Sequence, residues 1–119
     1  MAYLHLLASW RNQDYEAVEE IIDDEMIATF VKDDGSIVRL NKQELLAIFK
    51  ERFEMDQDWN FEVIYKGKKR QSEIVIVTVS REDEDFNLIE DKSICTLVFR
   101  KKDDVQKLKR MTFEMGIIE

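Results

Sequence analysis

The only histidine of the chain, His5, lies four residues before Ser9 in an apolar N-terminal segment. Residues four apart share one face of a helix, so an imidazole base and a hydroxyl nucleophile could meet there. Such a pair also needs an orienting acid and an oxyanion site, and no motif in the sequence supplies either. We therefore interpret His5 and Ser9 as part of a solvent-facing or lightly hydrogen-bonded polar stripe.

Two acidic segments could supply oxygen ligands to a metal ion, namely DDEM at 23–26 and EDEDFNLIED at 82–91. Neither has the Asp-x-Asp-x-Asp-Gly order that wraps a calcium ion, and runs of like charge usually stay hydrated. Cys95 is the only cysteine, which excludes an internal disulfide framework and a cysteine-based zinc site. We expect solvated acidic turns, no metal and no cofactor, and a reducing, cytoplasmic location.

The net charge of −8 lies entirely in the first half of the chain. Residues 1–60 carry 6 basic and 14 acidic side chains, whereas residues 61–119 carry 12 of each. An acidic protein repels phosphate backbones, so nucleic acid is not an expected partner. The N-terminus has no basic leader, and His5 and Ser9 interrupt its apolar run, so neither a signal peptide nor a membrane span is predicted.

The N-terminal segment predicts two helices separated by a bend at Asn12 and Gln13. Asp14 is a suitable N-cap for the second helix, which we expect to end near Asp23 or Asp24. Apolar residues recur at helical spacing in both helices: Tyr3, Leu4, Leu6, Leu7, Ala8 and Trp10 in the first, and Tyr15, Val18 and Ile22 in the second.

The next segments predict a hairpin and a third helix. MIATFV at 26–31 and SIVRL at 36–40 flank an acidic turn that contains Gly35, which is typical of a β-hairpin. Asn41 and Glu44 form a capping-box pattern at the start of the helix. Apolar residues then recur at helical spacing: Leu45, Ile48, Phe49 and Phe53.

From residue 59 the apolar pattern alternates with a period of two, which is typical of strands. Four long strands are predicted, over 59–65 and within EIVIVTVSR, KSICTLVFRK and VQKLKRMTFEMGII, and strands in such succession favour an antiparallel meander. Residues 1–119 are thus expected to form a single α+β domain. Three helices would pack on a strongly curved, mainly antiparallel sheet in the order α-α-β-β-α-β-β-β-β.

This order resembles the nuclear transport factor 2-like superfamily, also described as the cystatin-like α+β cone. Two segments carry the resemblance: SWRNQDYEAVEEIIDDEMIATFV is similar to that family's first two helices and first strand, and GSIVRLNKQELLAIFKERF to its hairpin and third helix. The resemblance spans essentially the whole chain and is one of pattern. It implies that the bent helical pair closes a cone, that a pocket lies between helices and sheet, and that two copies often pair through the sheet.

The superfamily includes ketosteroid isomerases, polyketide cyclases, dehydratases, limonene-epoxide hydrolases and domains that only bind or dimerise, so fold alone does not select a chemistry. The resemblance implies that an isomerase would need a tyrosine on the first helix and an aspartate on the first strand. Those positions fall on Leu6 and Phe30, which cannot transfer a proton. A dehydratase of the scytalone type would need two histidines, and this chain has one. We therefore assign no catalytic residue.

The favoured function is a noncatalytic module that binds a small hydrophobic ligand or dimerises. Five aromatic residues are the candidate ligand-binding walls of the cone: Trp10, Phe30, Phe49, Phe53 and Phe113. Aromatic residues also form ordinary cores, but a hollow apolar cone would favour a small apolar ligand. The enzyme alternative is a small polyketide-cyclase-like or hydratase/isomerase-like enzyme that uses His5, Glu62 or Glu114 as its acid/base group.

Two predicted strands are apolar on both faces. Val75, Val77 and Val79 alternate with Ile74 and Ile76, and the next strand alternates Cys95, Leu97 and Phe99 with Ile94 and Val98. A sheet with one solvated face would alternate more cleanly, so we expect the second face to be buried in a symmetric homodimer.

Basic residues gather at two predicted turns: Lys66, Lys68, Lys69 and Arg70 at one, and Arg100, Lys101, Lys102, Lys107, Lys109 and Arg110 around the other. Alternate turns of a meander lie at the same end of a sheet, so both groups would share one rim, with 82–91 at the opposite end. A protein-interaction adaptor that uses this charged rim is the remaining alternative. The simpler interpretation is a solvated rim that discourages strand-edge association.

Overall fold

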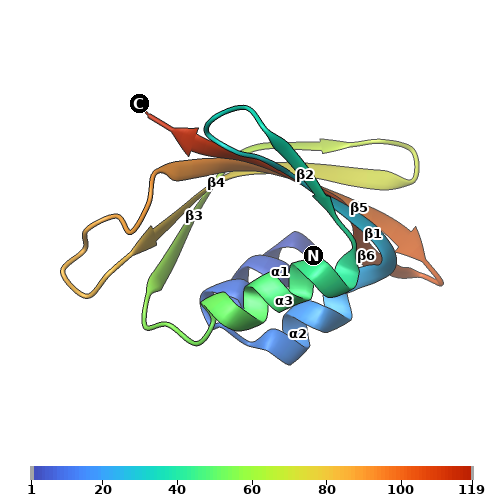
Figure 1. The fold of residues 1–119 in the computed structure, drawn as a ribbon. Coiled ribbons are helices and arrows are strands. Elements are labelled where there is room, and N and C mark those ends of the chain that lie inside the picture. The colour runs from blue at the N-terminus through green and yellow to red at the C-terminus, as the bar shows by residue number, and fades with distance from the viewer. Residues whose placement is uncertain (1, 119) are drawn as a thin grey trace.

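The computed structural model describes residues 2–118, which form helices packed on one mixed sheet (Figure 1). The helices are α1 (Ala2–Arg11), α2 (Tyr15–Ile21) and α3 (Lys42–Arg52), and the strands are β1 (Ile22–Val31), β2 (Ile37–Leu40), β3 (Asp58–Lys68), β4 (Ser72–Glu82), β5 (Lys92–Lys102) and β6 (Val105–Ile117). The predicted α+β class and order of elements are confirmed.

The sheet has the strand order β2-β1-β6-β5-β4-β3. β3 to β6 form the predicted antiparallel meander, and β6 also pairs in parallel with β1. Figure 1 shows the sheet arching over the three helices, which lie together against its concave face. The sheet is not closed, because β2 and β3 remain as its two edges.

The bend between α1 and α2 lies at Gln13, whose φ of 54° is in the left-handed region. Asp14 caps α2 as predicted, since its carboxylate accepts a hydrogen bond of 3.2 Å from the Ala17 amide. The predicted end of α2 near Asp23 or Asp24 is wrong, because the helix ends at Ile21. Ile22 is already extended and pairs with β6, so sheet pairing overrides the helical pattern.

The hairpin and α3 form as predicted. Residues 28–31 of β1 pair with β2 across a turn in which Gly35 has a φ of 87°. The Glu44 amide donates to Asn41 Oδ1 at 2.9 Å, and the Asn41 amide donates to Glu44 Oε1 at 3.0 Å, which completes the capping box. The cap fixes where α3 begins and therefore how it meets the sheet.

The core lies between the helices and the concave face of the sheet. Trp10 of α1 is its centre: the indole contacts Phe49 of α3 with ring centroids 4.9 Å apart, Phe61 at 5.0 Å, Trp59 at 5.4 Å and Phe113 at 5.8 Å. Aromatic pairs at these separations add to the free energy of burial. This cluster joins α1 and α3 to β3 and β6.

The two faces of β4 and β5 separate as the sequence predicts. Val75, Val77, Val79, Cys95, Leu97 and Phe99 are buried under the helices. On the opposite, convex face, Ile74, Ile76 and Ile94 are half-buried and Val98 is buried. Burial raises the pKa of the Cys95 thiol, so this cysteine is held as a neutral core residue.

The predicted alternation of β3 holds at Trp59, Phe61 and Val63 and fails at Tyr65. An irregularity between Val63 and Tyr65 shifts the register, and Tyr65 pairs beside Ile76 on the convex face. The prediction was wrong because a bulge on an edge strand inserts one residue and reverses the faces beyond it. No helix between residues 2 and 118 is both long enough and apolar enough to cross a membrane.

Candidate functional site

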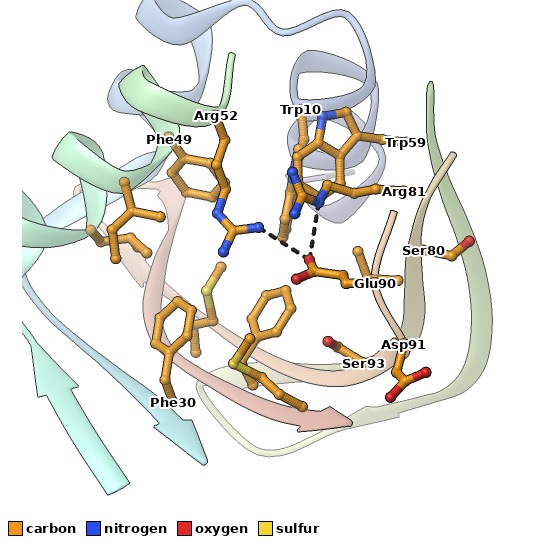
Figure 2. A pocket seen from close by; sticks show the side chains of 16 residues that line it. Trp10, Phe30, Phe49, Arg52, Trp59, Ser80, Arg81, Glu90, Asp91 and Ser93 are labelled. Carbon is orange, nitrogen blue, oxygen red and sulfur yellow. Dashed lines mark hydrogen bonds and ion pairs between the residues drawn. The ribbon is translucent and has the colours of Figure 1, made fainter. Parts of the chain in front are cut away.

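A recess lies at the wide end of the cone, between α3, the concave sheet face and the β4–β5 loop (Figure 2). The recess is partly open, and its volume is about 30 Å³, which is room for about two water molecules. Apolar side chains form most of its wall: Trp10, Phe30, Leu45, Ile48, Phe49, Trp59, Val79, Met111, Phe113 and Met115. Arg52, Ser80, Arg81, Glu90, Asp91 and Ser93 complete the lining. The cone is therefore nearly filled by its own side chains.

Four of the five predicted aromatic residues meet in this recess: Trp10, Phe30, Phe49 and Phe113. Phe30 and Phe113 stack with ring centroids 5.3 Å apart and planes 7° from parallel. Phe53 does not line the recess; its ring packs on Phe49 at 5.4 Å from just beyond the end of α3. The binding role of these residues stays a prediction.

The two positions that an isomerase would use carry no proton-transfer group. Leu6 is completely buried in the core, and Phe30 is partly buried where β1 faces the recess. The other acid/base candidates lie elsewhere. Glu62 and Glu114 are exposed and face away from the helices, because they alternate along their strands with Phe61 and the recess-lining Phe113.

His5 and Ser9 do not form a nucleophilic pair. Ser9 is buried, and its hydroxyl donates to the backbone carbonyl of His5 at 2.8 Å. The imidazole of His5 is on the exposed side of α1. This is the local back-bonding that serine makes inside helices, so the pair has a structural role.

Glu90 lies at the mouth of the recess between two arginines, as Figure 2 shows. Its Oε1 atom accepts a hydrogen bond of 3.1 Å from Arg52 Nη1 and one of 3.0 Å from Arg81 Nε. Partial burial alone would raise the pKa of Glu90, but the hydrogen bond from Arg81 and the charges of both arginines outweigh it, so this pKa is lowered. The prediction that 82–91 is simply a solvated turn was wrong for Glu90, because two buried or half-buried cations draw its carboxylate inward.

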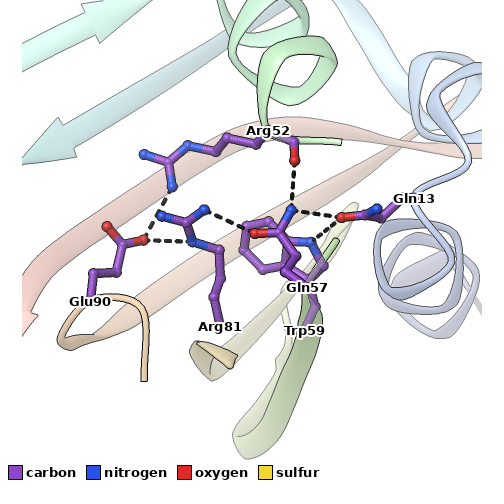
Figure 3. Close-up of polar contacts among 6 residues, drawn as sticks. All are labelled: Gln13, Arg52, Gln57, Trp59, Arg81 and Glu90. Carbon is purple, nitrogen blue, oxygen red and sulfur yellow. Dashed lines mark hydrogen bonds and ion pairs between the residues drawn. The ribbon is translucent and has the colours of Figure 1, made fainter. Parts of the chain in front are cut away.

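A chain of hydrogen bonds continues from the arginines to the bend between α1 and α2 (Figure 3). Arg81 Nη1 donates to Gln57 Oε1 at 2.9 Å, and Gln57 Nε2 donates to Gln13 Oε1 at 2.7 Å and to the Arg52 carbonyl at 2.6 Å. The Trp59 indole also donates to Gln13 Oε1, at 3.0 Å. The mouth of the cone is therefore fixed by side chains from each layer of the fold.

Arg81 is the residue of this mouth that sequence analysis missed most clearly. Its side chain is only 9% exposed, and its guanidinium lies 5.4 Å from the ring centroid of Trp59. A signal was present, because Arg81 continues the inward-facing register of Val77 and Val79 on β4. An arginine in such a register is either paired inside or marks a site. Arg52 and Glu90 carried no comparable signal.

A second, more open hollow adjoins the recess and is lined by Lys32, Asp33, Glu90, Asp91, Met115 and Gly116. Within residues 2–118 no group of three or more His, Cys, Asp or Glu side chains is placed to hold a metal ion. The two basic turns lie at one end of the sheet, since Ser72 pairs with Arg100, and loop 83–91 lies at the other end (Figure 1). Acids of β1 offset the basic end, because Lys109 Nζ is 3.7 Å from both Asp23 and Glu25.

No protein-family model and no curated protein matches the sequence. Solved structures match by fold. A domain of unknown function with a cystatin-like fold from Nostoc punctiforme has a TM-score of 0.73 and 13% identity, over 98% of this chain and 74% of that one. A nuclear transport factor 2-like protein of unknown function from Shewanella oneidensis has a TM-score of 0.72 and 13% identity, over 95% and 93% of the two chains.

A ketosteroid isomerase-like protein from Erwinia carotovora atroseptica has a TM-score of 0.70 and 14% identity, over 98% of this chain and 92% of that one. With the curved sheet and its three helices, these matches define a cystatin-like α+β fold. More particularly, the chain has the nuclear transport factor 2-like fold, as the sequence pattern predicted.

Proposed function

We propose that the protein is a noncatalytic dimerisation module with a nuclear transport factor 2-like fold, in which two copies pair through their convex sheet faces. The observation that carries the noncatalytic part is the filled cone, in which the recess has a volume of only about 30 Å³. Substrate pockets are usually several hundred cubic ångströms. The carboxylate at its mouth, Glu90, is held ionised by two arginines and is a poor general base.

The convex face supports the dimer because it is apolar at its centre. Three isoleucines, at 74, 76 and 94, surround Thr78 and Thr96, and neighbouring strands pair these residues side by side. Side chains that are half-buried in one copy gain further burial in a second copy, at about 25 cal/mol per Å² of apolar surface. Burying both faces in this way accounts for strands that are apolar on both sides.

The charges on this face are self-complementary. Arg110, which the sequence placed with the basic rim, faces the convex side beside Val98, and Glu114 lies on the same face of β6 beside Ile94. Thr112 lies midway between them. In a two-fold interface, if residue i of one copy contacts residue j of the other, then j of the first also contacts i of the second. A two-fold axis that crosses β6 near Thr112 would therefore bring Arg110 of each copy to Glu114 of the other.

Light scattering at micromolar concentration tests the dimer. The expected mass is twice the 14.2 kDa of one chain. A mass of one chain at every concentration up to 100 times higher would overturn the proposal. Because salt screens the charge pairs between Arg110 and Glu114, added salt is expected to promote dissociation.

A small apolar ligand in the cone is the second candidate function. The recess favours it because four of the predicted aromatic walls converge there and its lining is mainly apolar. The volume of about 30 Å³ is small, so a ligand fits only if a side chain of the recess moves.

A further inference from the structure

The two guanidinium groups at the mouth of the recess are turned toward one acceptor. Glu90 Oε1 accepts hydrogen bonds from both Arg52 Nη1 and Arg81 Nε, and Figure 2 shows the carboxylate between the two groups. A guanidinium carries five N–H donors in a fixed fork that matches a carboxylate. The contacts to Glu90 use one donor of Arg52 and one of Arg81, so the pair could bind a carboxylate more completely than Glu90 does.

Arg81 is held more firmly than Glu90, whereas the Arg52 side chain is 30% exposed and its hydrogen bond is to Glu90 itself. Arg81 is 9% exposed and is fixed by its hydrogen bond to Gln57 and its contact with Trp59. The Glu90 side chain is 36% exposed and belongs to the loop between β4 and β5. Rotation of Glu90 into solvent would therefore leave Arg81 as a fixed cation, beside which Arg52 can turn toward a bound carboxylate.

The space behind the carboxylate is apolar. Phe30, Phe113, Met111 and Met115 line it, together with the aromatic centre of the core. Methionine side chains adapt their shape at small cost, which suits a narrow site that must widen. An occupant with one anionic end and a short apolar body fits both parts of this arrangement.

We propose that the recess binds a small apolar monocarboxylate whose carboxylate replaces that of Glu90 between Arg52 and Arg81. Glu90 is then an internal substitute for the ligand, which keeps the arginines paired while the site is vacant. This inference rests on the second candidate function and is independent of the dimer. Glu90 is the side chain that must move away from the arginines to admit the ligand.

Hexanoate and hexanol, which share an apolar chain and differ in charge at pH 7, are the probes. Binding is followed in the full chain by the fluorescence of Trp10 and Trp59, which both line the recess. Glu90→Ala removes the competing carboxylate, and hexanoate is expected to bind this variant at least tenfold more tightly than the unmodified protein. Hexanol is expected to bind the two proteins within about threefold.

Glu90→Gln keeps the size of the side chain and guards against loss of folding in the alanine variant. It removes the one negative charge between the two arginines, so hexanoate is expected to bind it at least threefold more tightly than the unmodified protein. Adding Arg52→Met to Glu90→Ala is expected to remove the preference for hexanoate. Thermal melting of every variant confirms that each is folded.

The outcomes separate this inference from the function on which it rests. If hexanol binds but neither Glu90 variant prefers hexanoate, the carboxylate site is wrong and the apolar ligand pocket stands. If neither probe binds any variant, both proposals fail. A tenfold gain for hexanoate that persists after Arg52→Met would also overturn the proposal, because the anion would then be recognised elsewhere.

Discussion

The side-chain oxygen of Gln13 lies 3.0 Å from the indole nitrogen of Trp59 and accepts its hydrogen bond. The amide nitrogen of Gln13 in turn donates to the carbonyls of Phe53 at 3.3 Å and Met55 at 3.2 Å. One side chain at a helix bend thus fixes α1 and α2 to the start of β3 and to the segment after α3. The bend is a structural joint that determines how the helices cover the cone.

Gln13→Ala is expected to lower the free energy of unfolding by about 1–3 kcal/mol, because the Trp59 indole and two carbonyls lose their partner. Urea unfolding followed by circular dichroism measures the loss. Gln71→Ala is the matched control: Gln71 is exposed and accepts one long contact of 3.4 Å from Arg100. A control loss as large as that of Gln13→Ala would contradict a special role for the bend.

Trp10→Ala is expected to cost about 3–5 kcal/mol of unfolding free energy, because the indole fills the cone and contacts rings from α3, β3 and β6. The neighbouring exposed Leu4 is the control, and Leu4→Ala is expected to change stability by less than about 0.5 kcal/mol. Chemical unfolding of both variants provides the test. A loss below 1 kcal/mol for Trp10→Ala would mean that the aromatic cluster is not the core.

Gly116→Ala is expected to destabilise the protein more than Gly35→Ala. Both glycines have positive φ, 73° and 87°, which costs an alanine about 1–2 kcal/mol. A Cβ at Gly116 would also lie 2.5 Å from the Cβ of Asp33, whereas one at Gly35 meets nothing within 4 Å. Melting temperatures of the two variants are the measurement, and equal shifts would show that the close approach to Asp33 costs nothing.

Glu90→Gln is expected to destabilise the protein at pH 7 and to have less effect at pH 3. The pKa of Glu90 is lowered in the folded state from an ordinary value of 4.5, so its stabilisation is complete above that value. The stabilisation is lost as pH falls through the lowered pKa. The effect is modest because the side chain is partly exposed and screened.

The difference in melting temperature between the unmodified protein and Glu90→Gln, taken at both pH values, is the measurement for this prediction. Asp23, Asp24 and Asp34 also have lowered pKa values, but they are present in both proteins and cancel in the difference. A difference that does not shrink at pH 3 would show that the effect of Gln is steric.

The dimer predicts a charge-reversal pattern on β6. Arg110→Glu and Glu114→Arg should each weaken dimerisation at least tenfold, because like charges then meet across the two-fold axis. The double exchange should restore it. Lys50→Glu, an equal charge change at an exposed position of α3, should have no effect. Analytical ultracentrifugation measures all four, and failure of the double exchange to recover would exclude this axis.

Local signals in the sequence were sufficient for most of the fold. Asn41 with Glu44 determined the start of α3, and the period-two pattern of β4 and β5 determined both their extent and their buried faces. The errors arose where distant pairing decides the outcome. Ile22 leaves α2 because β6 accepts it into the sheet, and Tyr65 changes face because of a bulge that no local pattern marks.

The site was less accessible to sequence analysis. Four of five aromatic residues were brought together because each lay on an apolar face already assigned to the core. The ion pair between Glu90 and its arginines joins a loop, a helix end and a strand that are far apart in the chain. Only Arg81 carried a local signal, its place in an inward-facing register.

β6 is the last strand in the chain, yet it lies inside the sheet between β1 and β5. Without residues 105–117 the strands form two separate pieces of sheet, β1 with β2 and β5 with β4 and β3, each with an unpaired inner edge. Such edges attract strands of other chains. Any change that loosens β6 from the sheet would therefore expose both inner edges at once and favour aggregation.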